Sequence, residues 1–196
     1  MSAPAAPPLL LASTSPQRRA ILAQLRLPFD VVAPRYEERA EGGRPAELVR
    51  EHALGKARSV ASEAGRRPVV GVDTIVHCRG RIFGKPRTAE EAAETLATLA
   101  GDVHDVVSGL ALVTPGWELV EHDVTRVRFR ALTARDVAGY VAAGEWEGRA
   151  GAYAIQGLGA ALVERIEGDY LNVVGLPAAV LVRILAERFA GTYGFG

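Results

Sequence analysis

The sequence predicts an α/β fold with a mixed, twisted sheet, flanking helices and two lobes around a cleft. Short apolar segments typical of strands alternate with longer segments whose apolar residues recur at helical spacing. Hairpin-like strand pairs interrupt this alternation, which favours a mixed sheet over a purely parallel, doubly wound one. A chain of 196 residues suffices for one domain with a sizeable core. We therefore expect a single domain over residues 1–196, with flexible ends at residues 1–7 and 190–196.

The composition is that of an ordinary globular protein, with 48% hydrophobic and 23% charged residues. The formal net charge is zero, so neither nucleic acid nor an anionic membrane is favoured as a partner, whereas a small phosphate-bearing ligand needs only a local cluster of cations. The single cysteine, Cys78, excludes an internal disulfide and a multi-cysteine zinc site. No apolar run approaches membrane-spanning length, and the start lacks the basic region of a signal peptide. We expect a cytoplasmic protein.

The first strand and helix are expected at Leu9–Ala12 and from Pro16 to about Leu25. Ser15 is a natural N-cap, and Pro16 is a natural first helical residue. The strand, the hydroxyl-rich loop, the helix N-terminus and two following arginines together form a sensible anion site. The alternative is a plain capped helix with two surface arginines, since most capped helices bind nothing.

The next segments contribute acidic residues and a lysine. A second strand is expected at Phe29–Ala33, followed by a loop over residues 34–39 that carries Glu37 and Glu38, and by a turn at residues 41–44. A helix from Pro45 to about Ala64 follows, with apolar residues at helical spacing. Lys56 lies on this helix, and spacing alone favours a solvated charge there.

The stretch from Gly71 to Pro86 is the chemical centre of the sequence. An apolar run ends on Asp73, and a carboxylate at the end of a buried strand is held rigidly where it can face a cleft. A hairpin pairs Ile75–Cys78 with Arg81–Phe83 and returns Lys85 to the same end, where it can neutralise a phosphate. The alternative is that Asp73 caps a turn and that Lys85 is a solvated charge. The spacing before Pro86 does not fit a phosphate-binding P-loop.

The remaining chain continues the α/β pattern. A capping box at Thr88 begins a helix to about Leu99, and Thr133 caps another to about Ala142. Further expected elements are strands at Val103–Val113, Glu118–Phe129 and Ala160–Ile166, a flexible polar connection at Gly144–Ala152, and a closing helix at Pro177–Phe189.

A cluster of Asp102, His104 and Asp105 resembles a metal site at first sight. On a strand, Asp102 and His104 share a face, whereas Asp105 points to the other face. A structural histidine is therefore favoured over a metal ligand.

Four blocks of the sequence resemble the Maf family of nucleoside triphosphate pyrophosphatases. The blocks are ASTSPQRRAIL, GVDTIV with GKP, the SG after HDVV, and AGAYAIQG with ERIEGDYLNVVGLP. The resemblance extends from about Leu9 to Leu185 and implies a fold similar to inosine triphosphate pyrophosphatases. The DT at Asp73 and the IQG ending at Gly157 look like the branch that acts on dTTP and UTP. Gln17 departs from that branch, which usually has arginine there, and the ASTSP start also occurs in the branch that acts on 7-methyl-GTP.

The resemblance implies a catalytic carboxylate and a set of substrate-binding side chains. It makes Asp73 the catalytic residue and implies active-site positions at Ser13, Arg18, Glu38, Lys56, Lys85 and Gln156. It also implies cleavage of a nucleoside triphosphate between its α and β phosphates. Arg18, Lys56 and Lys85 can offset the phosphate charge, and Glu38 and Asp73 can hold Mg²⁺ or Mn²⁺ or activate a water.

Base selection is expected to depend on Gln156 and Thr74, and on Gln17, which stands where the resembled branch usually has arginine. The amide of Gln156 can pair with the edge of uracil or thymine, and Thr74 is small enough to leave room for a pyrimidine. The alternatives are a pyrophosphatase for 7-methyl-GTP or a broader set of modified nucleotides, and a non-enzymatic nucleotide sensor that regulates septum formation. A serine hydrolase is disfavoured because no G-x-S-x-G is present. A homodimer is possible.

Overall fold

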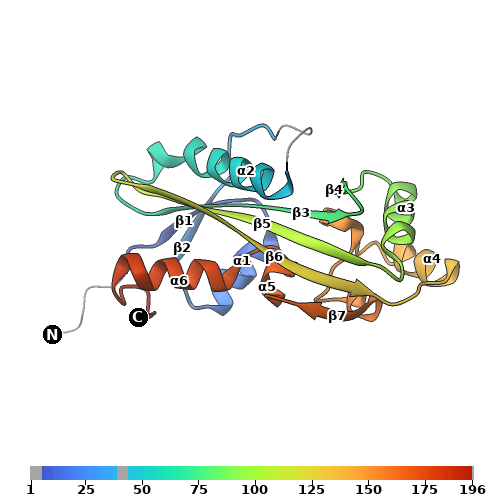
Figure 1. Cartoon of the computed structure of the whole chain (residues 1–196). Helices are drawn as coiled ribbons and strands as arrows, with labels where there is room; N and C mark the ends of the chain where they lie inside the picture. Colours follow the sequence, from blue (N-terminus) through green and yellow to red (C-terminus); the bar gives the residue numbers. More distant parts are fainter. Residues whose placement is uncertain (1–5, 39–43, 196) are drawn as a thin grey trace. The chain divides into compact units, whose positions relative to one another are not determined.

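Seven β-strands form one mixed sheet in the computed structural model, which describes residues 6–38 and 44–195 (Figure 1). The strand order is β2-β1-β3-β5-β6-β7, and β4 pairs with β3 outside this path. Pairing is parallel between β1 and its neighbours β2 and β3, and antiparallel in the β3–β4 and β6–β7 pairs. The strands are β1 Leu9–Ala12, β2 Phe29–Val32, β3 Val69–Cys78, β4 Arg81–Phe83, β5 Val103–Val113, β6 Glu118–Phe129 and β7 Val163–Glu167. The predicted mixed α/β architecture is confirmed.

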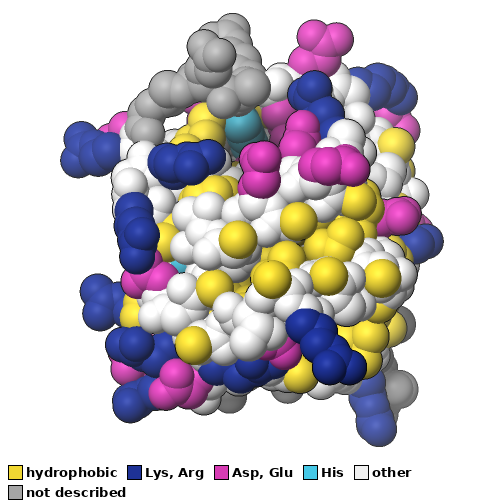
Figure 2. Space-filling view, turned by 90° about the vertical axis from the view of Figure 1, so that its right-hand side faces the viewer, with side chains coloured by type: hydrophobic (Ala, Val, Ile, Leu, Met, Phe, Trp, Pro, Cys, Tyr) yellow, Lys and Arg dark blue, Asp and Glu magenta, His cyan; other side chains and the backbone are white. Residues whose placement is uncertain are grey.

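The contacts divide the chain into two compact units. The first comprises residues 1–73, 108–123 and 175–196, and the second comprises residues 74–107 and 124–174. The division falls within β3, β5 and β6, so each of these strands contributes residues to both units. On the face shown in Figure 2, hydrophobic side chains gather in the middle, and acidic and basic side chains lie mostly around them.

The first unit places helix α2 (Pro45–Ser59) directly against the sheet. Figure 1 shows α2 on one side of the strands and α6 (Ala178–Phe189) on the other. Two glycines on neighbouring strands allow the close approach. A Cβ atom at Gly71 would lie 2.1 Å from the carbonyl oxygen of Ala53, and one at Gly109 would lie 2.1 Å from that of Val49. The helix backbone therefore contacts the strands, which fixes the side chains of α2 that face β3.

The second unit has its own core beneath α3 (Ala89–Leu99) and α4 (Ala134–Ala142). Phe129, Tyr153 and the buried His104 form an aromatic cluster, with ring centroids 4.8 to 5.5 Å apart. The His104 Nε2 atom lies 2.9 Å from the Tyr153 hydroxyl, so the prediction of a structural histidine is confirmed. The β3–β4 hairpin turns at Arg79 and Gly80, which both have the positive φ that a tight two-residue turn requires.

Most predicted element boundaries are confirmed to within a residue. Strands β1, β4, β5 and β6 begin and end where the sequence predicts them. Helix α1 (Pro16–Gln24) also begins as predicted, although the Ser15 side chain makes no capping hydrogen bond to it. The reciprocal capping box forms at Thr133 and Asp136, whereas the Glu91 carboxylate accepts the Arg87 N–H instead of closing a box with Thr88.

Two predicted boundaries are wrong. Helix α2 ends at Ser59 instead of near Ala64. At this end the Ser59 hydroxyl donates to the Lys56 carbonyl. A separate 3-10 turn, η1 (Ala61–Glu63), follows. The strand predicted at Ala160–Ile166 is a 3-10 turn, η3 (Leu158–Leu162), followed by β7.

In the η3 turn, a side chain and not a neighbouring strand binds the backbone N–H groups. The Glu145 carboxylate accepts the backbone N–H groups of Leu158 and Gly159 at 2.9 and 3.1 Å. A Cβ atom at Gly159 would lie 2.5 Å from the Ala154 carbonyl oxygen, so the chain can fold back only with glycine there. The short helix α5 (Tyr170–Val174) was not predicted from the sequence.

The two ends of the chain differ, because the structure describes the C-terminal segment as far as residue 195 but the N-terminal one only from residue 6. Residues 41–43 of the predicted turn and residues 1–5 of the predicted tail lie outside the described residues. In the C-terminal segment, Tyr193 is buried and its hydroxyl donates to the Pro7 carbonyl at 3.0 Å. Within the described ranges, no helix is long and apolar enough to cross a membrane.

Candidate active site

Asp73 lies in the interior of β3, not at the end of a strand as the sequence analysis predicted. The strand runs for ten residues because the β-branched residues after Asp73 continue the extended pattern as far as Cys78. Asp73 is buried, with 5% of the residue exposed. Burial of a carboxylate is costly unless donors or cations surround it, so the neighbours of Asp73 determine its state.

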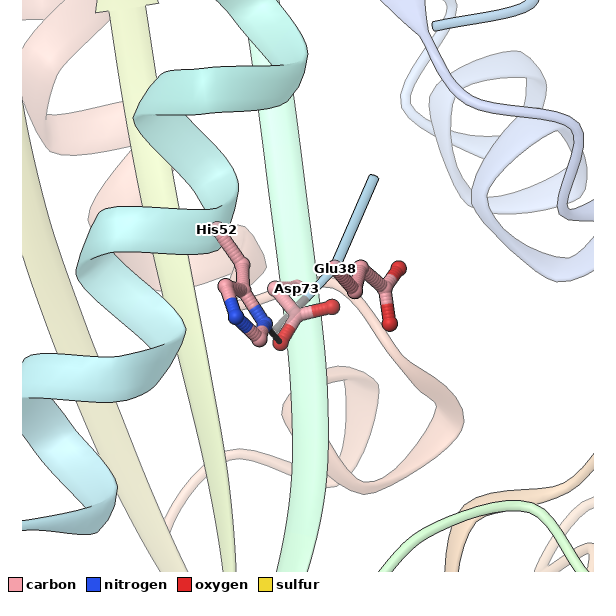
Figure 3. Close-up of side chains that lie close together, drawn as sticks. All are labelled: Glu38, His52 and Asp73. Atoms are coloured by element: carbon pink, nitrogen blue, oxygen red, sulfur yellow. Dashed lines mark hydrogen bonds and ion pairs between the residues drawn. The ribbon is translucent and has the colours of Figure 1, made fainter. Parts of the chain in front are cut away.

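Two side chains of α2 bind the Asp73 carboxylate. The Lys56 ammonium donates to Oδ1 at 2.5 Å, and His52 Nδ1 lies 3.3 Å from Oδ2. His52 and Lys56 are four residues apart, so they share one face of the helix. Figure 3 shows His52 and Asp73 pointing toward each other from the helix and the strand. Lys56 is buried, so the solvated charge that spacing alone favoured is wrong.

Glu38 reaches the same cluster from the segment before α2. Its Oε1 lies 2.6 Å from the Lys56 ammonium, which therefore bridges Glu38 and Asp73. The aromatic ring of Tyr36 anchors this segment on α2. A Cβ atom at Gly55 would lie 2.2 Å from that ring, and the ring also packs against His52 with centroids 5.8 Å apart. Glycine at position 55 thus makes room for the segment that carries Glu38.

The electrostatics of the cluster favour an ionised Asp73. Burial alone would raise the pKa of Asp73, but the hydrogen bond from His52, the charge and hydrogen bond of Lys56 and the charge of Arg18 together hold that pKa well below its usual range. The hydrogen bond to Asp73 raises the pKa of His52 despite its burial. The carboxylate is therefore charged and held by donors on two sides.

Arg18 and Ser13 form a second group in the same unit. The Arg18 guanidinium donates to the Gly175 carbonyl at 2.9 Å and to the Ser13 hydroxyl at 3.2 Å. The Ser15 N–H also donates to the Ser13 hydroxyl, and the Ser15 hydroxyl donates to the Gln17 side-chain oxygen. Burial lowers the pKa of Arg18, although the charges of Asp73 and Glu38 oppose that effect. Arg18 is therefore electrostatically coupled to the carboxylates.

The other predicted site residues belong to the second unit. Thr74 directly follows Asp73 in β3, and its side chain is half-buried. Lys85 is exposed in the loop after β4, where it lines a groove of about 520 Å³ together with Arg81, Glu91 and Glu94. Gln156 is exposed between two 3-10 turns. Their part in a common site with Asp73 stays a prediction.

Glu38 and Asp73 could hold a metal ion, with His52 close beside them. The candidate ligand atoms of Glu38, His52 and Asp73 all lie within 4.8 Å of one another. Carboxylate oxygens suit Mg²⁺ and Mn²⁺, whose opposite ligands lie about 4.2 Å apart, so small side-chain shifts bring these oxygens into range. The Lys56 ammonium already lies between Glu38 and Asp73, so a bound cation would share the carboxylates with it. The two carboxylates therefore fit a divalent cation that shares them with the Lys56 ammonium.

His52 is the residue of this cluster that the sequence analysis missed. Its position four residues before Lys56 on a predicted amphipathic helix was a usable signal, because residues at this spacing point in the same direction. That signal could not reveal that the shared face lies over Asp73, which depends on the packing of α2 against Gly71 and Gly109.

Fold and site together define a mixed α/β protein with a buried, charged cluster of carboxylate, lysine and histidine next to a hydroxyl–arginine group at the start of its first helix. Residues 8–188 match the family described as Maf-like protein. The chain therefore belongs to the Maf family.

Relatives from three bacteria share most of their length with this chain, and each is named dTTP/UTP pyrophosphatase. The relative from Gloeobacter violaceus is 48% identical over 181 residues, which cover 91% of this chain and 95% of that protein. The relative from Nitratidesulfovibrio vulgaris is 46% identical over 189 residues, covering 95% and 90%. The relative from Deinococcus radiodurans is 41% identical over the whole length of both chains.

Among solved structures, the Staphylococcus aureus Ham1 protein is similar with a TM-score of 0.44 and 15% sequence identity. The similarity covers 63% of this chain and 72% of that one. A likeness at this level does not distinguish between related α/β folds, so the predicted relation to inosine triphosphate pyrophosphatases stays a prediction.

Proposed function

We propose that this protein hydrolyses dTTP and UTP to the nucleoside monophosphate and pyrophosphate. The observation that carries the proposal is the buried Asp73 carboxylate, which Lys56 and His52 contact and which Lys56 links to Glu38. Such a charged, preorganised group stabilises charge that develops in a reaction better than solvent does. The names of the relatives at 41–48% identity support the same activity and the same substrates.

In the proposed reaction, a water oxygen forms a bond to the α-phosphorus of the nucleotide. The bond from that phosphorus to the bridging oxygen breaks, and pyrophosphate leaves with the bonding electrons. Arg18, Lys56 and Lys85 offset the negative charge of the phosphates, and the Ser13 hydroxyl adds a hydrogen bond. A divalent cation, when bound by Glu38 and Asp73, would polarise the phosphate oxygens or the water.

Asp73 is better suited to orienting than to accepting a proton. An efficient general base has a pKa near the operating pH, whereas the surroundings hold the pKa of Asp73 well below its usual range. We therefore assign Asp73 the task of fixing the attacking water or a metal ion. The proton of the water passes to solvent or to a phosphate oxygen.

The choice of base belongs to Gln156, Thr74 and Gln17 in this proposal. The Gln156 amide can donate to and accept from the edge of uracil or thymine, and a site built for such pairing rejects bases that leave its polar groups unpaired. Gln17 in place of arginine is the feature that favours the second candidate, a preference for 7-methyl-GTP.

The test is a panel of nucleotides with Mg²⁺ or Mn²⁺, scored by pyrophosphate release as kcat/KM. We expect dTTP and UTP to exceed CTP, GTP and 7-methyl-GTP by at least about tenfold, because a base that leaves polar groups of the site unpaired is rejected. A clear preference for 7-methyl-GTP would contradict the pyrimidine assignment but retain the reaction type. Absence of pyrophosphate release from every nucleotide would favour the non-enzymatic sensor.

The proposal also includes a single functional domain in the cytoplasm, where the nucleotide pool lies, and a homodimer as its assembly. Sedimentation analysis of the purified protein tests the dimer, because a monomer at micromolar concentration would exclude a stable one.

A further inference from the structure

His52 is buried beside Asp73 and contacts its carboxylate. The residue is 4% exposed, and its Nδ1 atom lies 3.3 Å from a carboxylate oxygen. Lys56 donates to the other oxygen of the same carboxylate, so two side chains of one helix contact the two Asp73 oxygens separately. A carboxylate held at both oxygens cannot rotate about its terminal bond without breaking a hydrogen bond.

The second ring nitrogen indicates which role His52 has. Within the part of the chain that the structure describes, the buried Nε2 atom has no hydrogen-bond partner. A histidine that ligates a metal almost always donates its other N–H to a partner, which orients the ring. His52 has no such support, so donation from Nδ1–H to Asp73 explains the arrangement better than ligation of a metal.

We propose that His52 is a positioning residue, whose Nδ1–H fixes the orientation of the Asp73 carboxylate for catalysis. The proposal rests on the proposed function in one respect, namely that Asp73 takes part in the reaction. Loss of the donor leaves Asp73 bound to Lys56 alone and free to rotate, which lowers turnover more than substrate binding.

Three substitutions separate the donor from the volume of the ring. His52→Leu removes the donor and fills the site with an apolar side chain. His52→Asn places an amide nitrogen at the same number of bonds from Cα as Nδ1, so it can still donate to Asp73. His52→Gln places its amide nitrogen one bond further out, as Nε2 is. We expect kcat with the preferred nucleotide to fall about tenfold to 100-fold in the Leu and Gln variants and to recover at least threefold in Asn, with KM changed less than threefold.

Two controls isolate stability effects. His122→Asn removes an exposed histidine of the first unit and should change neither kcat nor the melting temperature. Leu181→Ala removes a buried side chain of α6, a helix that carries no residue of the cluster, and should lower the melting temperature with little change in kcat. A Leu variant with unchanged kcat, or an Asn variant no better than Gln, would overturn the positioning role.

A second readout does not depend on activity. A long-range ¹H–¹⁵N spectrum of the wild-type protein should show His52 protonated at Nδ1, and Asp73→Ala should shift that resonance. An unprotonated Nδ1 would overturn the proposal even in a protein that releases pyrophosphate. Conversely, protonated Nδ1 in a protein without nucleotide turnover would place the failure with the proposed function.

Discussion

Asp73 is the residue whose charge should matter most. Asp73→Asn keeps the shape of the side chain but removes the negative charge that faces Lys56 and His52. We expect kcat to fall by about 100-fold or more, the range found when one preorganised polar group of an active site is removed. Circular dichroism should show an intact fold. Asp30→Asn on β2 is the matched control, and equal turnover in both variants would remove Asp73 from the mechanism.

The three cations proposed to bind the phosphates should affect activity more than two exposed arginines do. Arg18→Ala, Lys56→Ala and Lys85→Ala should each lower kcat/KM by about tenfold or more, because each removes a charge proposed to offset the phosphates. Arg66→Ala and Arg79→Ala change exposed side chains and serve as controls. Equal, small effects in all five variants would leave only a generic surface of charges.

Lys56 should differ from Lys85 in stability as well. Its ammonium is buried between two carboxylates, so Lys56→Ala leaves the Asp73 charge with fewer partners. Removal of one partner of a buried ion pair costs about 3–5 kcal/mol in the free energy of unfolding. Chemical denaturation of both variants measures the difference.

His104 should make stability depend on pH. Burial lowers the pKa of His104 to about 4, whereas an unfolded histidine titrates near 6.5. Between these values the native state binds fewer protons than the unfolded state, so the free energy of unfolding falls as pH drops from 6.5 to 4. The loss from this group is about 3 kcal/mol. His104→Phe should remove that slope, and an unchanged slope in urea titrations at several pH values would contradict the assignment.

At the scale of elements, the packing of α2 on the sheet should control both stability and activity. Gly109→Ala would place a Cβ atom 2.1 Å from the Val49 carbonyl oxygen, so the helix must move away from β5. We expect a loss of about 2 kcal/mol or more, as for other overpacked cores, together with a lower kcat because His52 and Lys56 move with the helix.

The control for Gly109→Ala is a glycine away from α2. Gly139→Ala on α4 adds a Cβ atom with nothing within 4 Å and should stabilise the protein by about 0.5–1 kcal/mol, because alanine favours a helix. Loss of stability in both glycine variants would indicate a general intolerance rather than the close contact of α2.

Most elements could be predicted from the sequence because neighbouring residues determine them. Alternation, apolar runs and caps were enough for β5, β6 and the start of α4, where Thr133 forms its capping box. The segment after Gly157 was predicted incorrectly because a distant carboxylate, Glu145, caps its backbone. No local signal shows such a partner.

At the scale of the whole molecule, the order of the elements predicted the mixed sheet. The sequence predicted only part of the candidate site. The resemblance to the Maf family implied Glu38, Lys56 and Asp73 as site residues, and contacts in the structure join them. His52 was missed because its burial against Asp73 depends on tertiary packing, which spacing alone does not reveal. Asp73 was placed at the end of a strand although the β-branched residues that follow it were a local signal that β3 continues to Cys78.

The measurement that tests the central claim most directly is the identity of the products. Purified protein is incubated with dTTP and Mg²⁺, and the products are separated by ion-exchange chromatography and assigned by ³¹P spectroscopy. The account predicts dTMP and pyrophosphate in equal amounts, with Asp73→Asn forming them far more slowly. Formation of dTDP and inorganic phosphate would contradict it, because the cleaved bond would then lie between the β and γ phosphates.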